Sequence, residues 1–420
     1  QAEALDLAAI RIRIEPRAEW RQIYHEAWRI NRDFFYAPNF HGADWPAMRE
    51  KYEPFLDHLA TRGDLNRVIR WLCSELAVGH HRVGGGERLE RPERVPGGLL
   101  GCDFAVAGGR YRFRRIYGGL NWNPGLRAPL TAPGERVREG EYLLAVGGRP
   151  VRAPANVHAF FEQTAGRRVR LEVGPDPEGR IRRSVTVVPI ASERALRRRA
   201  WVERNRRRVE EATGGRVAYV YVPDTSTTGH SWFKRYFYPQ ADRQAIIVDE
   251  RFNRGGSVAD YYIDLLRRPV ISWWAMRYGR DLKIPSASIQ GPKVMLIDET
   301  AGSGGDLLPW MFRRFRLGPL VGKRTWGGLV GILGFPRLLD GGRVTAPNLA
   351  FWTPGEGFGV ENVGVPPDIE VEQWPAAVAK GQDPQLEKAI EMVLELLAED
   401  PPRRPRRPPY PVRNPRAGGE

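Results

Sequence analysis

The sequence predicts a multidomain chain of the α/β class (α+β as a whole), with strands and helices alternating in its second half. Three near-continuous apolar runs, RVAYVYVP, QAIIVDE and PKVMLIDE, are each followed by turn residues and a helical segment. Such runs are typical of strands that are covered on both faces. With 420 residues, 42% of them hydrophobic, the chain is long enough for two or three domains with their own cores.

The first part of the chain is predicted to be helical. The stretches AEWRQIYHEAWRINRDFFY and DLNRVIRWLCSELAVG carry apolar residues at helical spacing. A cluster of Pro and Gly, GGGERLERPERVPGGLLG, then indicates a domain boundary. We therefore expect a helical module over residues 14–95.

A small β-rich module is predicted next, over residues 96–190. It contains the short strand-like segments RYRFRRIY, GEYLLAVGGRPV, RVRLEVG and RRSVTVVPI, and one helix-like segment, PANVHAFFEQTAG. The α/β core is expected over residues 191–400, from the arginine-rich helix ERALRRRAWVERNRRRVEE to the helix DPQLEKAIEMVLELLAE. Residues 401–420 are rich in Pro and Arg, a composition that favours a disordered tail.

The net charge of +15 raises the question of a nucleic-acid partner. Six arginines lie in the tail and eight in the arginine-rich helix, where they suit a solvated face. No zinc finger, aromatic ribonucleoprotein motif or heptad accompanies the charge. Sequence-specific nucleic-acid binding is therefore not expected.

The sequence lacks the features of membrane proteins, secreted proteins and cysteine-rich scaffolds. No apolar run approaches the roughly 18 residues needed to span a bilayer, and no secretory signal is visible at the amino terminus. The two cysteines, Cys73 and Cys102, cannot form a disulfide scaffold or a four-cysteine zinc site. We expect a cytoplasmic protein without a membrane partner. Because the sequence begins with Gln, it is compatible with a fragment or a processed product.

One serine stands out for its position. The segment ETAGSGGDLLPWMF places Ser303 among small residues, after a predicted strand and before a predicted helix. Functional groups of α/β sheets gather at the carboxyl ends of strands, and free amides at a helix start can bind an oxyanion. Two interpretations stay open: Ser303 is a nucleophile, or it only caps the helix. The pattern is not the Gly-x-Ser-x-Gly elbow, because Ala301 replaces its first glycine.

A serine nucleophile needs a base, and the chain has seven histidines. In SELAVGHHRVGGG, His80 and His81 follow a helix and precede a glycine run, which suits a residue at a cleft edge. Adjacent histidines point apart in extended chain, so a paired metal site is not expected. GPLVGKRT is not a phosphate loop, because Arg324 stands where Ser or Thr should follow the lysine. We expect no metal and no other cofactor. The remaining histidines sit in ordinary helical or polar contexts: His25, His41, His58, His158 and His230.

Together, several segments resemble the catalytic half of the tricorn serine proteases, relatives of the carboxy-terminal processing peptidases. The resemblance runs from about Ile14 to Glu399 and implies a helical first part of the catalytic domain, an inserted PDZ-like domain and a crotonase-like α/β core. The motif GGLLGCDF then stands where a PDZ carboxylate loop would be. The segments that carry the resemblance are SELAVGHHRVGGGE, VDERFNRGGS, ETAGSGGDLLPWMFRRFRLGPLVGKRTWGGLVGI and VENVGVPPDIEVE.

The resemblance also implies catalytic roles. Ser303 matches the nucleophile, His80 the general base and Glu361 the acid of the charge relay, while the amides of Gly256 and Gly304 match the oxyanion hole. In such a site the base takes the serine proton, the acid fixes the tautomer and the amides stabilise the developing oxyanion.

Substrate contacts are implied in the same way. The backbone at Arg254, Gly255 and Gly256, and the segment near Ile332, would line the peptide as an added extended strand. The family's preference for a basic P1 residue depends on an acidic pocket residue, but the corresponding position here is near Trp274. The nearest acid is Asp281.

Two further departures from the family pattern concern the catalytic centre. The family commonly has Ser immediately before the catalytic His, linked to the acid, whereas this chain has Gly79, so the relay would run through another residue or a water. Archaeal members often have Asp after the nucleophile, whereas Gly304 offers only its amide.

We therefore expect a serine peptidase that hydrolyses oligopeptides or unfolded segments through an acyl-enzyme. The alternative is a catalytically degenerate peptide-binding module of the PDZ and protease-like type, for which Gly79 is the main argument. The resemblance further implies a homo-oligomer, a hexamer in the family, and upstream β-propellers, whose repeat pattern this sequence does not contain.

Overall fold

The computed structural model describes residue 10 and residues 13–87, 92–134, 136–403 and 405–413. The chain divides into two compact units, of which unit 1 comprises Gln1–Leu89 and Val209–Glu420, and unit 2 comprises Glu90–Arg208. The ends of the expected tail and of the amino-terminal stretch, and part of the Pro- and Gly-rich boundary, lie outside the described residues.

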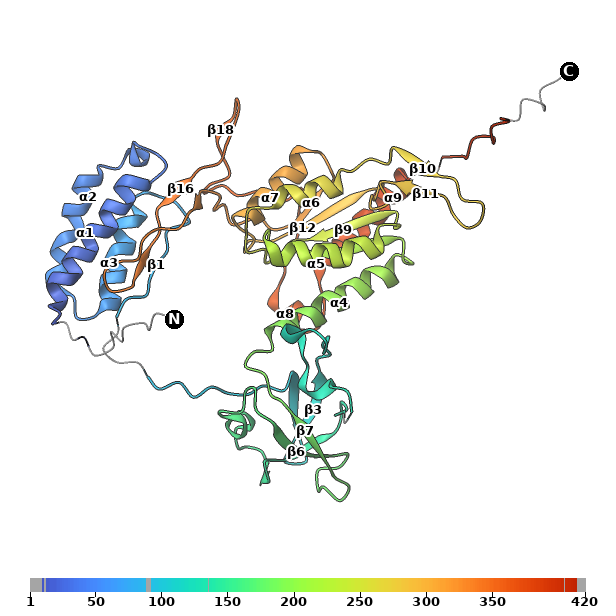
Figure 1. The fold of residues 1–420 in the computed structure, drawn as a ribbon, viewed down its shortest axis with the longest axis horizontal. Helices are drawn as coiled ribbons and strands as arrows, with labels where there is room; N and C mark the ends of the chain where they lie inside the picture. The colour runs from blue at the N-terminus through green and yellow to red at the C-terminus, as the bar shows by residue number, and fades with distance from the viewer. Residues whose placement is uncertain (1–9, 11–12, 88–91, 135, 404, 414–420) are drawn as a thin grey trace, which may run out of the picture. The chain divides into compact units, whose positions relative to one another are not determined.

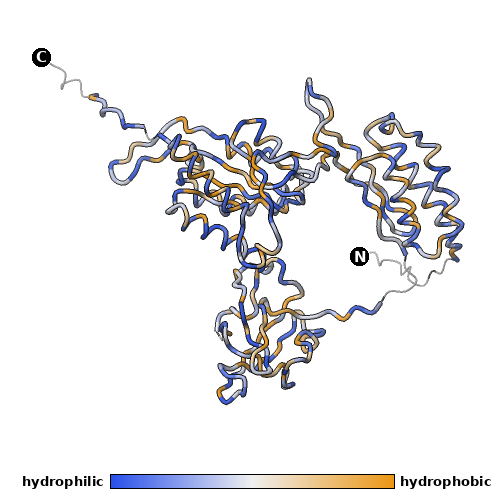
Figure 2. The backbone as a smooth tube through the Cα atoms, turned by 180° about the vertical axis from the view of Figure 1, so that it is seen from behind, coloured by the Kyte–Doolittle hydropathy of each residue, from blue (hydrophilic) through white to orange (hydrophobic). Residues whose placement is uncertain are grey.

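Unit 1 begins with three helices, α1 (Pro16–Phe34), α2 (Trp45–Tyr52) and α3 (Arg62–Ser74) (Figure 1). Two 3₁₀ turns, Phe40–Gly42 and Glu53–His58, connect them. Their apolar faces enclose a core that includes Tyr24, Trp45 and Leu72, as the helical spacing predicts. In Figure 2 these helices alternate hydrophobic and hydrophilic positions along the chain.

A short strand ties this helical module to the carboxy-terminal half of unit 1. After α3, strand β1 (Val83–Gly84) pairs antiparallel with β15 (Arg343–Val344). Val344 is buried in the same core as α1 and α3. Residues that are distant in sequence therefore form one structure here, and the segment before β1 carries His80.

The centre of the α/β part is a five-stranded sheet with the order β19-β13-β12-β9-β8 and parallel pairing throughout. Every residue of β8, β9 and β12 is buried, which explains their near-continuous apolar sequences. The strands are β8 (Val217–Tyr221), β9 (Ala245–Asp249), β12 (Lys293–Ile297), β13 (Leu320–Gly322) and β19 (Ile369–Glu370).

Helices cover this sheet. Helix α9 (Pro384–Glu399) packs on β9, β12 and β13, while α6 (Ala259–Leu266) packs between α5 (Thr227–Phe237) and α7 (Gly304–Arg314). A further short helix, α8 (Pro375–Ala379), precedes α9. The loops at the carboxyl ends of β9 and β12 lead to α6 and α7, so they lie at the same edge of the sheet.

Three short antiparallel pairs complete unit 1. These are β10 (Ser272–Trp274) with β11 (Leu282–Ile284), β14 (Gly331–Ile332) with β16 (Pro347–Leu349), and β17 (Trp352–Thr353) with β18 (Gly357–Phe358).

Unit 2 is an antiparallel sheet with the order β2-β3-β4-β6-β7, in which β5 (Arg149–Pro150) pairs with β4. Its core includes Phe113, Leu143 and Val173. The helix-like segment of the sequence forms only a 3₁₀ turn, Val157–Phe161. The other 3₁₀ turns are Pro124–Leu126 and Pro129–Thr131. The strands are β2 (Cys102–Ala107), β3 (Arg110–Ile116), β4 (Tyr142–Val146), β6 (Val169–Gly174) and β7 (Arg183–Val187).

The arginine-rich segment forms helix α4 (Arg194–Ala212), as predicted. The mixture of helices, a parallel sheet and a separate β-rich unit confirms the predicted α/β multidomain class. Among the described residues, no helix is long and apolar enough to cross a membrane.

Candidate active site

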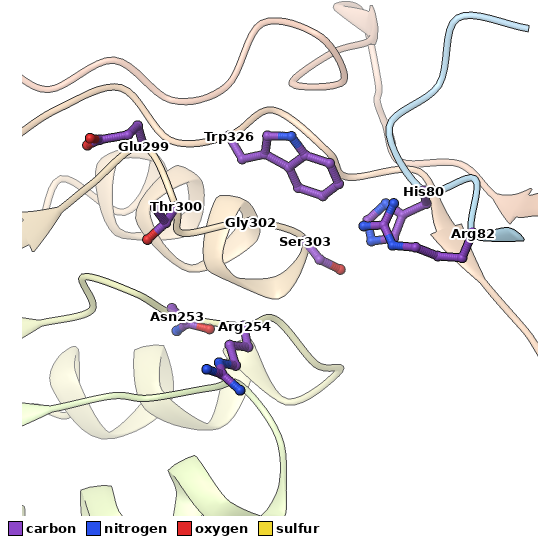
Figure 3. A pocket seen from close by; sticks show the side chains of 9 residues that line it. All are labelled: His80, Arg82, Asn253, Arg254, Glu299, Thr300, Gly302, Ser303 and Trp326. Atoms are coloured by element: carbon purple, nitrogen blue, oxygen red, sulfur yellow. The ribbon is translucent and has the colours of Figure 1, made fainter. Parts of the chain in front are cut away.

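The loop between β12 and α7 holds Ser303 in an unusual backbone conformation. Its φ is 60° and its ψ is −116°, a combination that costs a non-glycine residue about 1–3 kcal/mol. Hydrogen bonds hold the turn: the Ser303 amide donates to Asp306 Oδ2 at 2.7 Å, and the Gly302 amide donates to the Asn253 carbonyl at 3.2 Å. Figure 3 shows the Ser303 hydroxyl pointing out of the turn, toward His80.

Asp306 anchors this turn to the segment that follows β13. Its side chain is fully buried, and it also accepts hydrogen bonds from the Thr325 hydroxyl and from the amides of Gly327 (2.8 Å) and Gly328 (3.0 Å). Burial raises the pKa of Asp306, which these hydrogen bonds oppose. The sequence pattern places this residue in the first turn of the helix but does not predict that its carboxylate joins the Ser303 turn to the segment after β13. Its position three residues after the N-cap was the available signal.

Two amides next to Ser303 are free to bind an oxyanion. The N–H groups of Gly256 and Gly304 donate to no atom of the described residues, whereas those of Gly302, Ser303 and Gly305 all have acceptors. A Cβ at position 304 would lie 1.9 Å from Thr225 Oγ1 and 2.4 Å from the Gly256 carbonyl. The two backbones can approach this closely only because both positions are glycine. This close packing explains why the chain has no larger residue after Ser303.

His80 lies in the same pocket as Ser303. Its side chain is 8% exposed, its ring centre lies 5.2 Å from that of Trp326, and its Nδ1 is buried without a hydrogen-bond partner among the described residues. Burial, and secondarily the charge of Arg82, lower the pKa of His80, while Glu361 and Asp306 partly oppose this. The imidazole is therefore neutral at pH 7 and able to accept a proton. No hydrogen bond joins it to Ser303 in this structure.

The neighbouring histidine faces elsewhere. His81 Nε2 lies 3.0 Å from Asn31 Oδ1, and its ring stacks on Phe35 with 6.3 Å between centres. Its Nδ1 lies 3.4 Å from the Val78 carbonyl, so both ring nitrogens face oxygen atoms of the helical module. Burial lowers the pKa of His81 to about 4. His81 is thus a neutral residue of the helical module, and only His80 lines the pocket.

Glu361 is linked to the segment that carries His80 through a backbone amide. Its Oε1 accepts a hydrogen bond from the Gly79 amide at 2.8 Å, and its Oε2 accepts from the amides of Leu329 (2.6 Å) and Val330 (2.7 Å). It makes no hydrogen bond to His80 in this structure. Its charge nevertheless favours the protonated form of that imidazole.

Trp326 fills the space that a side chain at position 79 would need. A Cβ at Gly79 would lie 2.9 Å from Trp326 Cζ2 and 3.5 Å from Glu361 Oε1. At this position Glu361 therefore meets a backbone amide, and the indole of Trp326 occupies the space beside it. Trp326 is a pocket residue that sequence reasoning did not single out.

The pocket itself is lined by nine residues and opens to solvent (Figure 3). Arg254 is among them, and its amide donates to the Pro223 carbonyl at 3.1 Å. Ile332, on the edge pair β14–β16, is not. The full lining is His80, Arg82, Asn253, Arg254, Glu299, Thr300, Gly302, Ser303 and Trp326.

The candidate specificity residues are not brought to this pocket. Trp274 and Asp281 belong to the β10–β11 hairpin and its connection, and neither lines the pocket. Asp281 instead forms an ion pair with Arg407 of the carboxy-terminal segment, which holds the pKa of this carboxyl below its usual value.

Comparison with known proteins agrees with this architecture. Residues 16–73 match the family model described as "Tricorn protease C1 domain", residues 98–192 match "Tricorn protease PDZ domain", and residues 216–371 match "Peptidase family S41".

Full-length relatives extend the match. The chain is 38% identical over 96% of its length to "Tricorn protease homolog 1" of Streptomyces coelicolor and 34% identical over 92% of its length to "Tricorn protease" of Thermoplasma acidophilum. A solved structure of "the tricorn protease" superposes with a TM-score of 0.85 at 34% identity, covering 91% of this chain. The chain spans only 37% and 36% of those relatives and 37% of that solved chain. With C1, PDZ and S41 domains in this order, the chain belongs to the tricorn proteases of peptidase family S41.

Proposed function

We propose that the chain is a serine peptidase that cleaves oligopeptides or unfolded segments through an acyl-enzyme on Ser303. The observation that carries this proposal is the pair of unengaged amides, Gly256 and Gly304, beside a serine that shares its pocket with a neutral histidine. Such an arrangement provides a nucleophile, a base and an oxyanion site within one pocket.

In this mechanism His80 removes the Ser303 proton as the hydroxyl attacks the peptide carbonyl. Nε2 is the ring nitrogen that acts, because Nδ1 is buried. The carbonyl oxygen gains negative charge, which the amides of Gly256 and Gly304 stabilise. His80 then gives the proton to the leaving amine, and water releases the acyl group by the reverse sequence.

Glu361 contributes through its charge. The carboxylate stays fixed by three amides and favours the imidazolium that forms during the reaction. The Gly79 amide joins the acid to the segment that carries the base, so this connection positions the ring in place of a side-chain relay.

The substrate would bind as an extended strand along Arg254, Gly255 and Gly256, and β14 with Ile332 offers a strand edge in the same unit. The resemblance described above further implies that the active form would be a homo-oligomer. Two buried free thiols, Cys73 and Cys102, suit a reducing compartment such as the cytoplasm.

Labelling with a fluorophosphonate probe tests the proposal. Wild type should be labelled, whereas Ser303→Ala should not, and His80→Ala should be labelled far more slowly. Ser231→Ala, at an exposed serine of α5, is the matched control and should label like wild type. Labelling that persists in Ser303→Ala would refute the assignment. A wild type that binds peptides without being labelled would favour the degenerate peptide-binding module, for which Gly79 and the unpartnered His80 Nδ1 argue.

A further inference from the structure

Arg82 is a charged pocket residue for which the proposed hydrolysis provides no role. Its Nη1 donates to the carbonyls of Gly79 (2.8 Å) and His81 (3.1 Å), and its guanidinium lies over the Trp326 ring, 5.5 Å from the centre. The backbone is fixed as well, because the Arg82 amide donates to Thr345 Oγ1 at 2.7 Å. Although the residue is exposed, its charged group is therefore held in one place at the pocket wall.

One edge of this guanidinium remains unused. Nε and Nη2 of Arg82 donate to no atom of the described residues, and no described carboxylate pairs with the side chain. These two nitrogens present parallel N–H groups, the arrangement that binds both oxygens of a carboxylate. The fixed group thus offers a preformed site for a planar anion.

Acidic groups of the pocket do not compensate this charge. Glu361 is occupied by three amides, and Figure 3 shows the Glu299 side chain directed away from His80 and Arg82, beyond Trp326. Arg254 adds a second guanidinium without an ion-pair partner among the described residues. A peptide that enters the pocket therefore meets an unbalanced positive charge.

We propose that Arg82 binds a carboxylate on the leaving part of the peptide and so selects substrates that are acidic just after the scissile bond. This rests on the proposed function. His80 gives its proton to the leaving amine, so the pocket wall on its side faces the leaving product, and Arg82 is two residues further along the same segment. The carboxylate comes either from an Asp or Glu side chain or from the terminus of a short leaving product.

Kinetics with matched fluorogenic peptides test the selection. Four peptides share one sequence and carry Asp, Ala or Lys after the scissile bond with an amidated terminus, or Ala with a free terminal carboxylate. Wild type should favour a carboxylate, and Arg82→Met should lower kcat/KM for the preferred peptide about 10- to 100-fold more than for the amidated Ala peptide. Arg82→Glu should invert the preference toward Lys. Arg343→Met, which removes an exposed charge on β15, is the control and should keep the wild-type selectivity.

The results identify the source of the carboxylate or overturn the role proposed for Arg82. A preference for Asp over the free terminus assigns the side chain as the carboxylate source, and the reverse assigns the terminus. Equal losses for acidic and neutral peptides in Arg82→Met would overturn the proposal and leave Arg82 as a support for Trp326 and His80. Fluorescence anisotropy of the same peptides with the Ser303→Ala protein, with and without Arg82→Met, measures the preference for a carboxylate as a difference in affinity, without hydrolysis. Failure of the catalytic proposal alone would leave this binding difference intact.

Discussion

In the proposed mechanism, the protonation state of His80 decides whether Ser303 can be activated, and the charge of Arg82 influences that state. Burial and the Arg82 charge lower the pKa of His80, and the base must be neutral to act. Activity should therefore rise with pH through the His80 pKa and then level off. Arg82→Met removes a positive charge, so it should move this acid limb to higher pH. The pH profile of kcat/KM for a neutral peptide measures the shift, and an unmoved limb would show that the charge does not reach the imidazole.

The amide of Gly304 can be tested by a single methyl group. Gly304→Ala would place Cβ against Thr225 Oγ1 and the Gly256 carbonyl, so the turn must shift and the amide must move. We expect kcat to fall about 100- to 1,000-fold, the effect of losing one oxyanion donor. Gly359→Ala, at a position with no atom within 4 Å of the new Cβ, is the control. Unchanged kcat in a folded Gly304→Ala protein would exclude this amide from the oxyanion site.

Glu250 is a buried acid beneath the site that the mechanism does not use. Burial, followed by the charges of Asp298, Asp306 and Asp249, raises its pKa well above the usual value, which the neighbouring Asn253 side chain only partly opposes. The folded chain therefore keeps the proton that the unfolded chain releases above about pH 4.3, so the stabilising contribution of the protonated form is lost as pH rises toward the folded-state pKa.

Glu250→Gln should consequently raise the free energy of unfolding at pH 7. The gain should shrink toward pH 4, where the carboxyl is protonated in both states. Urea unfolding of wild type and variant at both pH values measures it. A variant that is less stable than wild type at pH 7 would mean that Glu250 is ionised in the folded chain.

Among the elements, strand β15 and the residue after it hold the segment of His80 and Arg82, the proposed base segment, in place. Thr345 Oγ1 donates to the His80 carbonyl at 2.8 Å and accepts from the Arg82 amide, while the Thr345 amide donates to the Arg82 carbonyl at 3.0 Å. Thr345→Val keeps the shape and the backbone bond but loses both hydroxyl contacts. We expect a stability loss of about 1–3 kcal/mol.

The same substitution should lower kcat more than it raises KM, because it loosens the base rather than the substrate site. Thr345→Ser restores the hydroxyl and should recover most of the activity. Steady-state kinetics and thermal unfolding of the three proteins separate the two effects. If Thr345→Ser is as impaired as Thr345→Val, the methyl packing and not the hydroxyl is what matters.

The elements also show what could be predicted from the sequence. The strands β8, β9 and β12 and the helices α1, α3, α4 and α9 follow from long apolar or amphipathic runs. Two-residue strands such as β1 and β15 carry no periodicity, so their pairing could not be foreseen. The helix predicted over residues 154–166 is only a 3₁₀ turn, Val157–Phe161, whose apolar residues are buried in the core of unit 2.

The site residues, like the elements, divide into those that a local sequence pattern indicates and those that only the folded chain brings together. Ser303 and the pair His80–His81 stand in short motifs that the sequence shows directly, but the catalytic roles of Ser303, His80 and Glu361 are implied only by the family resemblance. The roles of Thr345, Trp326 and Asp306 arise from contacts between distant segments, as when the Gly79 amide meets Glu361 across 282 positions. Such contacts are set by tertiary packing and have no local sequence signal.

At the scale of the whole molecule, each of the two units has its own core and one cysteine. Cys73 is fully buried in the helical core of unit 1, and Cys102 is buried in the core of unit 2. Burial raises the pKa of Cys73 to about 12 and also raises the pKa of Cys102. Neither thiol should react in the folded protein, because the thiolate is the reactive form.

The two thiols therefore report separately on the two cores. In a pulsed alkylation experiment over a urea series, with mass spectrometry to assign each cysteine, we expect no modification without urea and two distinct midpoints. Separate midpoints follow because the cores share no residue, so each can lose its packing without the other. Cys73→Ala and Cys102→Ala verify the assignment. Coincident midpoints would instead show that the inserted unit and the unit that carries Ser303 and His80 unfold as one cooperative structure.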